Sequence, residues 1–130
     1  MLSDTMNMLA SSEPRQVFAA AWEAFDVAGR VADAVTWEVG SDELQALVAA
    51  QSCSAGQALL PPPESGRPAE TPVLAEGAEG LDPWVDLLRQ VEAALVQLSD
   101  GQSAEARAVL VEAAGHADVG ATALAAVRGR

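Results

Sequence analysis

The sequence has 130 residues, enough for one domain with a single hydrophobic core, and half of it is hydrophobic, which argues against a chain that is disordered throughout. Its net charge is −12, and its seven basic residues are arginines scattered along the chain. Without a basic patch, direct binding to nucleic acid lacks the electrostatic attraction that it requires. An acidic chain could instead suit a partner with a basic surface.

The composition is rich in alanine and contains no isoleucine, lysine or tyrosine. These missing residues have AT-rich codons, so we predict a bacterial source with a GC-rich genome. Alanine favours helices but contributes little apolar area to a core. Oligomerisation can compensate for such a thin core. The single cysteine, Cys53, excludes an internal disulfide and a thiolate metal cluster.

The first twelve residues contain an acid, Asp4, and no basic residue before a hydrophobic run, unlike a secretory signal peptide. The longest uncharged run, 44–63, is interrupted by glutamines, serines and three prolines, which is not the pattern of a membrane span. We therefore expect a cytoplasmic protein that does not engage a membrane.

Residues 1–11 are predicted to be a flexible lead-in, and residues 13–37 have the pattern of one long amphipathic helix. The polar side chains of this helix fall in one narrow band. Its apolar arc covers roughly 220°, whereas a surface helix needs only about 100°. The helix should therefore touch more than one neighbour, either within its own bundle or on another chain.

This wide arc contains both phenylalanines of the chain and Trp22. We predict contact with a protein partner through Phe18, Trp22 and Phe25, with Trp37 at the end of the helix as a further contact. The alternative is that all four side chains belong to the intramolecular core.

A second helix is predicted over 42–60, after a stop at Gly40 and an N-cap at Ser41. So short a turn folds it back antiparallel on the first helix. Gln51 lies in the middle of its apolar stripe and needs a partner if it is buried. The stripe that we predict to be buried comprises Leu44, Leu47, Val48, Ala55, Ala58 and Leu59. Cys53 falls on the opposite side with Ala46 and Ala49, which predicts an accessible thiol.

Residues 61–81 are rich in proline, glycine, glutamate and alanine and are predicted to be a linker. Asp82 as N-cap and Pro83 then start a third helix, which has a narrow apolar stripe. The stripe comprises Trp84, Leu87, Leu88, Val91, Leu95 and Leu98. Ser103 caps a fourth helix, which we expect to be continuous to Arg128; a break at Asp118 is the alternative.

The pattern predicts an all-α protein, with residues 12–130 forming a single helical domain. We expect a four-helix bundle made of two antiparallel helical hairpins, 13–60 and 82–128, joined by the long linker over 61–81. In this arrangement each hairpin covers the apolar face of the other.

Few residues could support catalysis. The only histidine, His116, lies four residues after Glu112, so the two can share one helix face and are a weak candidate for a ligand or metal site. Di-iron bundles instead use two Glu-x-x-His motifs with further carboxylates. The chain has no glycine-rich phosphate loop and no nucleophile elbow. We expect no enzymatic activity, no cofactor and no resident metal.

Three functions remain compatible with these features. The leading hypothesis is a non-catalytic interaction or regulatory protein that forms a homodimer, or binds another protein, through the apolar face of helix 13–37. The second is a bundle that binds a small molecule or metal near Glu112 and His116. The third is an acidic inhibitor or immunity-type protein that covers a basic surface, and its binding should weaken steeply with salt.

Overall fold

The computed structural model describes residues 7–10, 13–36, 42–60 and 81–128. A short helical turn occupies residues 7–9, and no strand occurs in these ranges, so the prediction of an all-α protein is confirmed. The long helices are α2 (Pro14–Thr36), α3 (Glu43–Ala58), α4 (Asp82–Ser99) and α5 (Ala104–Arg128). None of the helices in the described ranges is long and apolar enough to cross a membrane. Trp37, the turn at 37–41 and the predicted linker, apart from Leu81, lie outside these residues.

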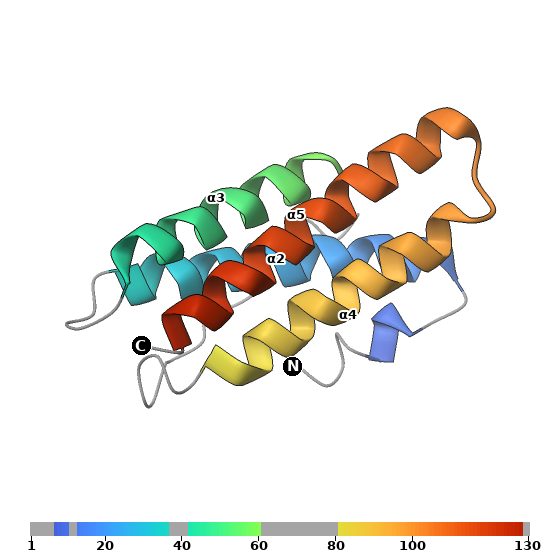
Figure 1. The fold of residues 1–130 in the computed structure, drawn as a ribbon. Helices are drawn as coiled ribbons and strands as arrows, with labels where there is room; N and C mark the ends of the chain where they lie inside the picture. Colours follow the sequence, from blue (N-terminus) through green and yellow to red (C-terminus); the bar gives the residue numbers. More distant parts are fainter. Residues whose placement is uncertain (1–6, 11–12, 37–41, 61–80, 129–130) are drawn as a thin grey trace.

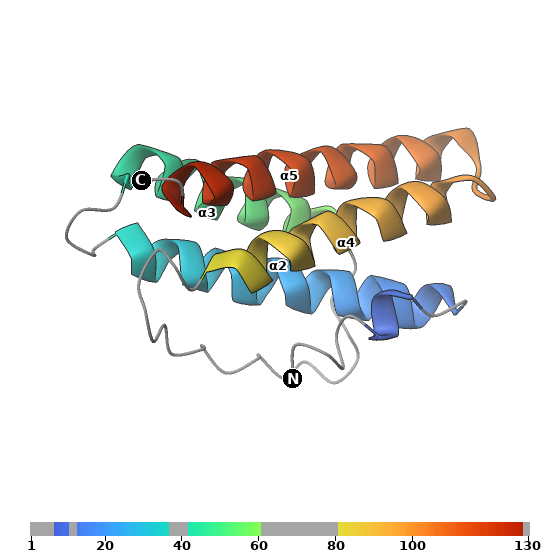
Figure 2. The ribbon, with the colours of Figure 1, turned by 60° about the horizontal axis from the view of Figure 1, so that its bottom comes forward.

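The long helices lie side by side (Figures 1 and 2). The colours of Figure 1 show that α2 and α3 run in opposite directions, as do α4 and α5. In addition, α3 packs against α5, and α2 packs against α4. Each long helix therefore shares its buried side between two main neighbours.

The apolar arc of α2 is largely covered within the chain. Its buried residues are Val17, Ala20, Ala21, Ala24, Phe25, Val27, Ala28, Val31, Ala32, Val35 and Thr36. Two neighbouring helices, α3 and α4, supply this cover. On the polar side, Asp26 and Arg30, four residues apart, form an ion pair with Oδ2 and Nη2 3.2 Å apart.

The sequence pattern was most informative for α4 and α5. All residues of the predicted α4 stripe are buried except Leu98, which is half-buried and packs against the core. Helix α5 continues through Gly115 and Gly120 to Arg128, so the predicted continuous helix is confirmed. Val109, near the start of α5, is 39% exposed.

The predicted orientation of α3 is wrong. The large apolar residues Leu44 and Leu47 are 69% and 45% exposed, and Ala58 is also exposed. The side that faces the core carries small residues instead: Ala46, Ala49, Ser52, Cys53 and Gly56. Cys53 is fully buried, so the expectation of an accessible thiol is wrong as well.

Close approach between helices explains this orientation. A Cβ atom added at Gly29 of α2 would lie 3.3 Å from Cβ of Cys53, and one added at Gly56 would lie 2.5 Å from Cζ of Phe25. On the other side of α3, a Cβ added at Gly120 of α5 would lie 3.6 Å from Sγ of Cys53. The space around α3 thus accepts only small side chains, and the leucines must face away from it.

The helix starts differ slightly from the sequence predictions. The side chain of Asp42, one residue after the predicted cap, accepts a hydrogen bond from the backbone N–H of Gln45 at 3.2 Å. Leu81 occupies the N-cap position of α4 and makes no side-chain capping bond, so the predicted cap at Asp82 is wrong. The predicted cap of α5 is confirmed, because the Ser103 hydroxyl accepts a bond from the N–H of Ala106 at 3.3 Å.

Candidate interaction surface

The four aromatic residues predicted to contact a partner do not share one environment in the structure. Phe25 is only 1% exposed and lies in the core, so it offers no surface to a partner. Phe18 and Trp22 are half-buried and pack against the edge of the core. Trp37 lies outside the described residues.

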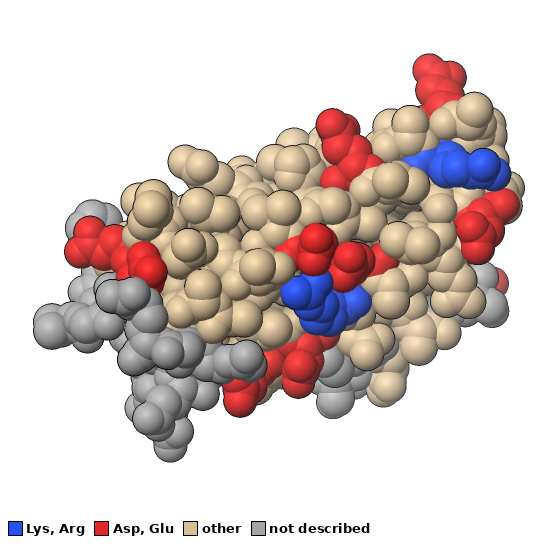
Figure 3. All heavy atoms as spheres, in the orientation of Figure 1, with Lys and Arg blue, Asp and Glu red and all other residues tan. Residues whose placement is uncertain are grey.

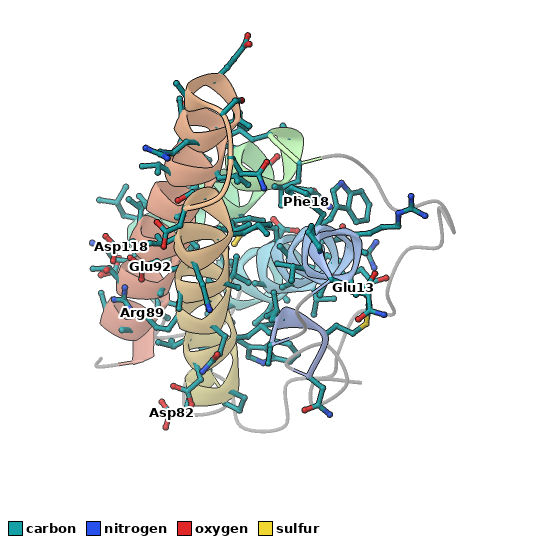
Figure 4. The ribbon with its side chains drawn as sticks, turned by 90° about the vertical axis from the view of Figure 1, so that its right-hand side faces the viewer. Glu13, Phe18, Asp82, Arg89, Glu92 and Asp118 are labelled. Atoms are coloured by element: carbon teal, nitrogen blue, oxygen red, sulfur yellow. The ribbon has the colours of Figure 1, made fainter. Side chains whose placement is uncertain are left out.

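Phe18 lines a small apolar hollow. Figure 4 shows the position of its side chain on α2. The hollow has a volume of about 250 Å³ and lies where α2, α5 and the end of α3 meet. Its lining includes Leu59, Leu60, Val109 and Leu110, together with Phe18. The hollow is large enough for one apolar side chain of a partner.

A larger apolar surface lies on α3, on the side opposite to the one that packs inward. Leu44, Leu47, Gln51, Ser54 and Ala58 are exposed and recur at alternating intervals of three and four residues, which places them along one side of a helix. Val48 beside them is half-buried. Together with the half-buried Ala55, these residues form what we call the α3 face.

The α3 face is free of charge. After Glu43, the helix contains no charged residue to its end at Ala58. Figure 3 shows most of the outward surface of α3 in tan, with acidic groups near its two ends. An uncharged, leucine-containing surface is unusual on a chain with a net charge of −12 and is typical of an interaction site.

The sequence pattern located this apolar stripe correctly but assigned it to the wrong side of the helix. The signal that could have shown its orientation is the second row of α3, in which Ala46, Ala49, Cys53 and Gly56 recur at helical spacing. A row of small residues permits close helix packing, so two faces of α3 could each have been the buried one. Only the side chains of α2 and α5 decide between them.

A polar hollow of about 460 Å³ lies between α2 and α3, on a different side of α3. Its polar lining comprises Asp26, Arg30 and Asp33 of α2, with Ser54 and Gln57 of α3. The Oδ2 atom of Asp26 is shielded from solvent, and apart from its ion pair with Arg30 it accepts no hydrogen bond in the described part of the chain. With two carboxylates and one guanidinium, the lining has a net negative charge. The sequence patterns did not predict this hollow.

Arg89 of α4 holds a polar contact to α5 at the surface (Figure 4). Its guanidinium donates hydrogen bonds to the carboxylates of Asp118 and Glu92 and, through Nη2, to the hydroxyl of Thr122 at 3.2 Å. The hydrogen bond to Asp118 is the main reason that the pKa of Arg89 is raised. The arginine stays charged in any case, so this cluster fixes two helices together and offers no proton-transfer group.

Glu112 and His116 lie on α5 one turn apart, the glutamate exposed and the histidine half-buried. Among the described residues, no group of three or more histidine, cysteine or acidic side chains could hold a metal ion. Burial of Cys53 raises the pKa of its thiol to about 12. The thiol therefore stays protonated near neutral pH and is a poor nucleophile.

Comparison of the chain with protein-family models, with curated proteins and with solved structures gives no match. The argument for function therefore rests on the surfaces described above.

Proposed function

We propose that this chain is a non-catalytic interaction protein that self-associates through the α3 face. The observation that carries the proposal is the outward orientation of Leu44 and Leu47 on a helix surface without charge. A second copy of the chain presents the same apolar face, and most soluble oligomers are assembled from identical chains.

The proposal treats the chain as a four-helix bundle of two antiparallel hairpins, α2–α3 and α4–α5, joined through residues 61–81. The opposite directions of the helices in each pair support this assignment. So does the shared core, to which every long helix contributes buried side chains. In such a bundle the outward side of α3 remains available to a partner.

The energetic argument concerns the exposed area of the two leucines. Full burial of a leucine side chain contributes about 1.5–3 kcal/mol. Since Leu44 and Leu47 together expose slightly more than one leucine equivalent, covering them gives about 2–3 kcal/mol per copy. Val48 and Ala58 add to this sum. Because association itself has an entropic cost, we expect a weak, concentration-dependent dimer rather than an obligate one.

This proposal moves the main contact from the helix at 13–37 to α3. Phe18 and Trp22 remain candidates for a smaller, second contact because both are half-buried at the edge of the core. Phe25 is not a candidate surface residue, since a partner could reach it only if α2 and α3 separated.

The experiment compares two positions of similar exposure, one on the α3 face and one on α4. Leu47→Asp places a charge in the α3 face, whereas Val96→Asp places the same charge on α4, where the native side chain is 47% exposed against 45% for Leu47. Sedimentation equilibrium should give a monomer for Leu47→Asp and leave the dimer of Val96→Asp unchanged. Melting curves of both variants show whether either has lost its fold.

If both variants dimerise like the wild type, the α3 face is not the interface. Trp22→Ala and Phe18→Ala then test the helix at 13–37 in the same assay. A loss of dimer in these variants alone, with melting temperatures close to that of the wild type, would place the contact on α2 and reject the α3 face.

The hollow between α2 and α3 supports a second candidate, the binding of a small organic cation. Its volume lies in the range of ligand pockets, and the net negative lining suits an ammonium or guanidinium group. Agmatine, which carries both groups, should raise the melting temperature of the wild type and have a smaller effect on Asp26→Asn. The absence of any shift at millimolar agmatine would reject this site.

A further inference from the structure

We propose that the two copies pack α3 against α3 in antiparallel directions, with Gln51 of each copy beside the two-fold axis. This inference rests on the proposed self-association and adds the orientation and register of the contact. It follows from the order of side chains along the α3 face, from the position of its charges and from the glutamine at its centre.

The α3 face is asymmetric along its length. Its first half carries the large side chains Leu44 and Leu47, and its second half carries Ala58 and the half-buried Ala55. Antiparallel pairing about Gln51 sets Leu44 opposite the partner's Ala58 and Leu47 opposite the partner's Ala55. Large side chains then meet small ones, which allows the two helices to pack without a gap. Parallel pairing would set leucine against leucine at one end and leave alanine against alanine at the other.

The charges favour the same orientation. Asp42 and Glu43 lie at the start of α3, and no further charge follows along this helix. Parallel packing would bring the acidic ends of both copies together. Antiparallel packing separates them by the length of α3, about 24 Å for 16 residues at 1.5 Å per residue. This distance exceeds the screening length of about 8 Å at physiological ionic strength, so the repulsion becomes small.

Gln51 gives a reason for a defined register. It lies at the centre of the α3 face and is exposed in the single chain; the other polar residue of this face, the exposed Ser54, lies opposite the partner's Val48 in the proposed register. A side-chain amide both donates and accepts hydrogen bonds, so two amides that face each other across a two-fold axis can satisfy one another. A shifted register would bury each amide against an apolar side chain, which is unfavourable. A polar residue at the centre of the interface sets the register of coiled-coil pairs in this way.

Cross-linking through introduced cysteines tests the orientation. The variants are Gln51→Cys, Leu44→Cys and Ala58→Cys, with Ala93→Cys on the exposed side of α4 as the control for random collision. The native Cys53 is buried and should stay unreactive, which the wild type checks directly. Leu44→Cys carries a size tag, so that its cross-linked product with Ala58→Cys can be distinguished on a gel. The reagent is a short bismaleimide, applied at a concentration where the wild type is dimeric.

We expect Gln51→Cys to cross-link to itself, and Leu44→Cys to cross-link to Ala58→Cys in a mixture. Neither of the latter should cross-link alone, because in the antiparallel arrangement two copies of residue 44 lie about 21 Å apart along the helix axis. Efficient self-cross-linking of both Leu44→Cys and Ala58→Cys would show parallel packing and overturn the inference.

The parallel result would leave self-association through the α3 face in place, and two further outcomes bear on both proposals. If the wild type is dimeric by mass but no α3 variant cross-links above Ala93→Cys, the contact lies elsewhere, and both the α3 face and its antiparallel pairing are rejected. If the wild type is monomeric at every concentration, the proposed function fails and the inference fails with it.

Discussion

Replacing Gly56 by alanine tests the close contact between α3 and Phe25 of α2, which determines the side of α3 that faces the core. A Cβ at this position would lie 2.5 Å from Cζ of Phe25, 2.7 Å from Cε1 and 2.9 Å from Cε2. The phenyl ring is 1% exposed and is enclosed by the core. The added methyl group therefore requires the ring, or the whole of α3, to move.

The magnitude follows from two opposing effects. To restore ordinary contact, the ring must withdraw by about 1 Å, and such overpacking of a core costs typically 1–3 kcal/mol. Alanine in a helix is favoured over glycine by about 0.5–1 kcal/mol. Because three ring atoms are involved, we expect the steric cost to dominate, with a net loss of about 1–2 kcal/mol. In a chain of this length 1 kcal/mol corresponds to about 4 °C in melting temperature.

The matched control is Gly115→Ala in α5. This glycine is exposed, and an added Cβ would meet no atom within 4 Å. The same substitution should therefore raise stability by about 0.5–1 kcal/mol. Urea unfolding of the two variants followed by circular dichroism measures both effects. The packing argument is refuted if Gly56→Ala is as stable as Gly115→Ala.

Three other predictions concern the remaining features. Cys53 should resist thiol reagents at pH 8 in the folded protein and react fully in denaturant; rapid labelling of the folded protein would contradict its burial. Because burial raises the pKa of this thiol to about 12, the unfolded chain loses the proton first, so stability should fall as the pH rises from about 9 toward 12, and Cys53→Ala should lessen this fall. Arg89→Gln should cost less than about 1 kcal/mol, since its ion pairs are exposed, and the effect should shrink in high salt; a larger loss in 1 M salt would be inconsistent with a screened surface cluster.

The sequence was sufficient to predict which side is buried for helices that have only one apolar side. In α4, the stripe from Trp84 to Leu95 is the only apolar side, so its burial followed from spacing alone. In α5, the apolar pattern continued in phase through Gly115 and Gly120, and one long helix resulted. The ion pair of Asp26 with Arg30 was equally predictable, because it depends only on residues four apart.

Helix α3 could not be oriented from its own sequence. One side offers more apolar area, with Leu44 and Leu47, and the other offers closer approach through Ala49 and Gly56. The choice depends on distances to α2 and α5 that no local pattern contains. The hollow between α2 and α3 was missed for the same reason, since it is formed by two elements together.

The most direct test of the central claim is the solution mass of the wild-type chain, measured by light scattering over a wide concentration series. Self-association through the α3 face predicts a mass that approaches twice the 13.4 kDa of the chain at high concentration and falls toward 13.4 kDa on dilution. The Leu47→Asp variant should stay at 13.4 kDa throughout. A wild-type mass of 13.4 kDa at every concentration would contradict the account.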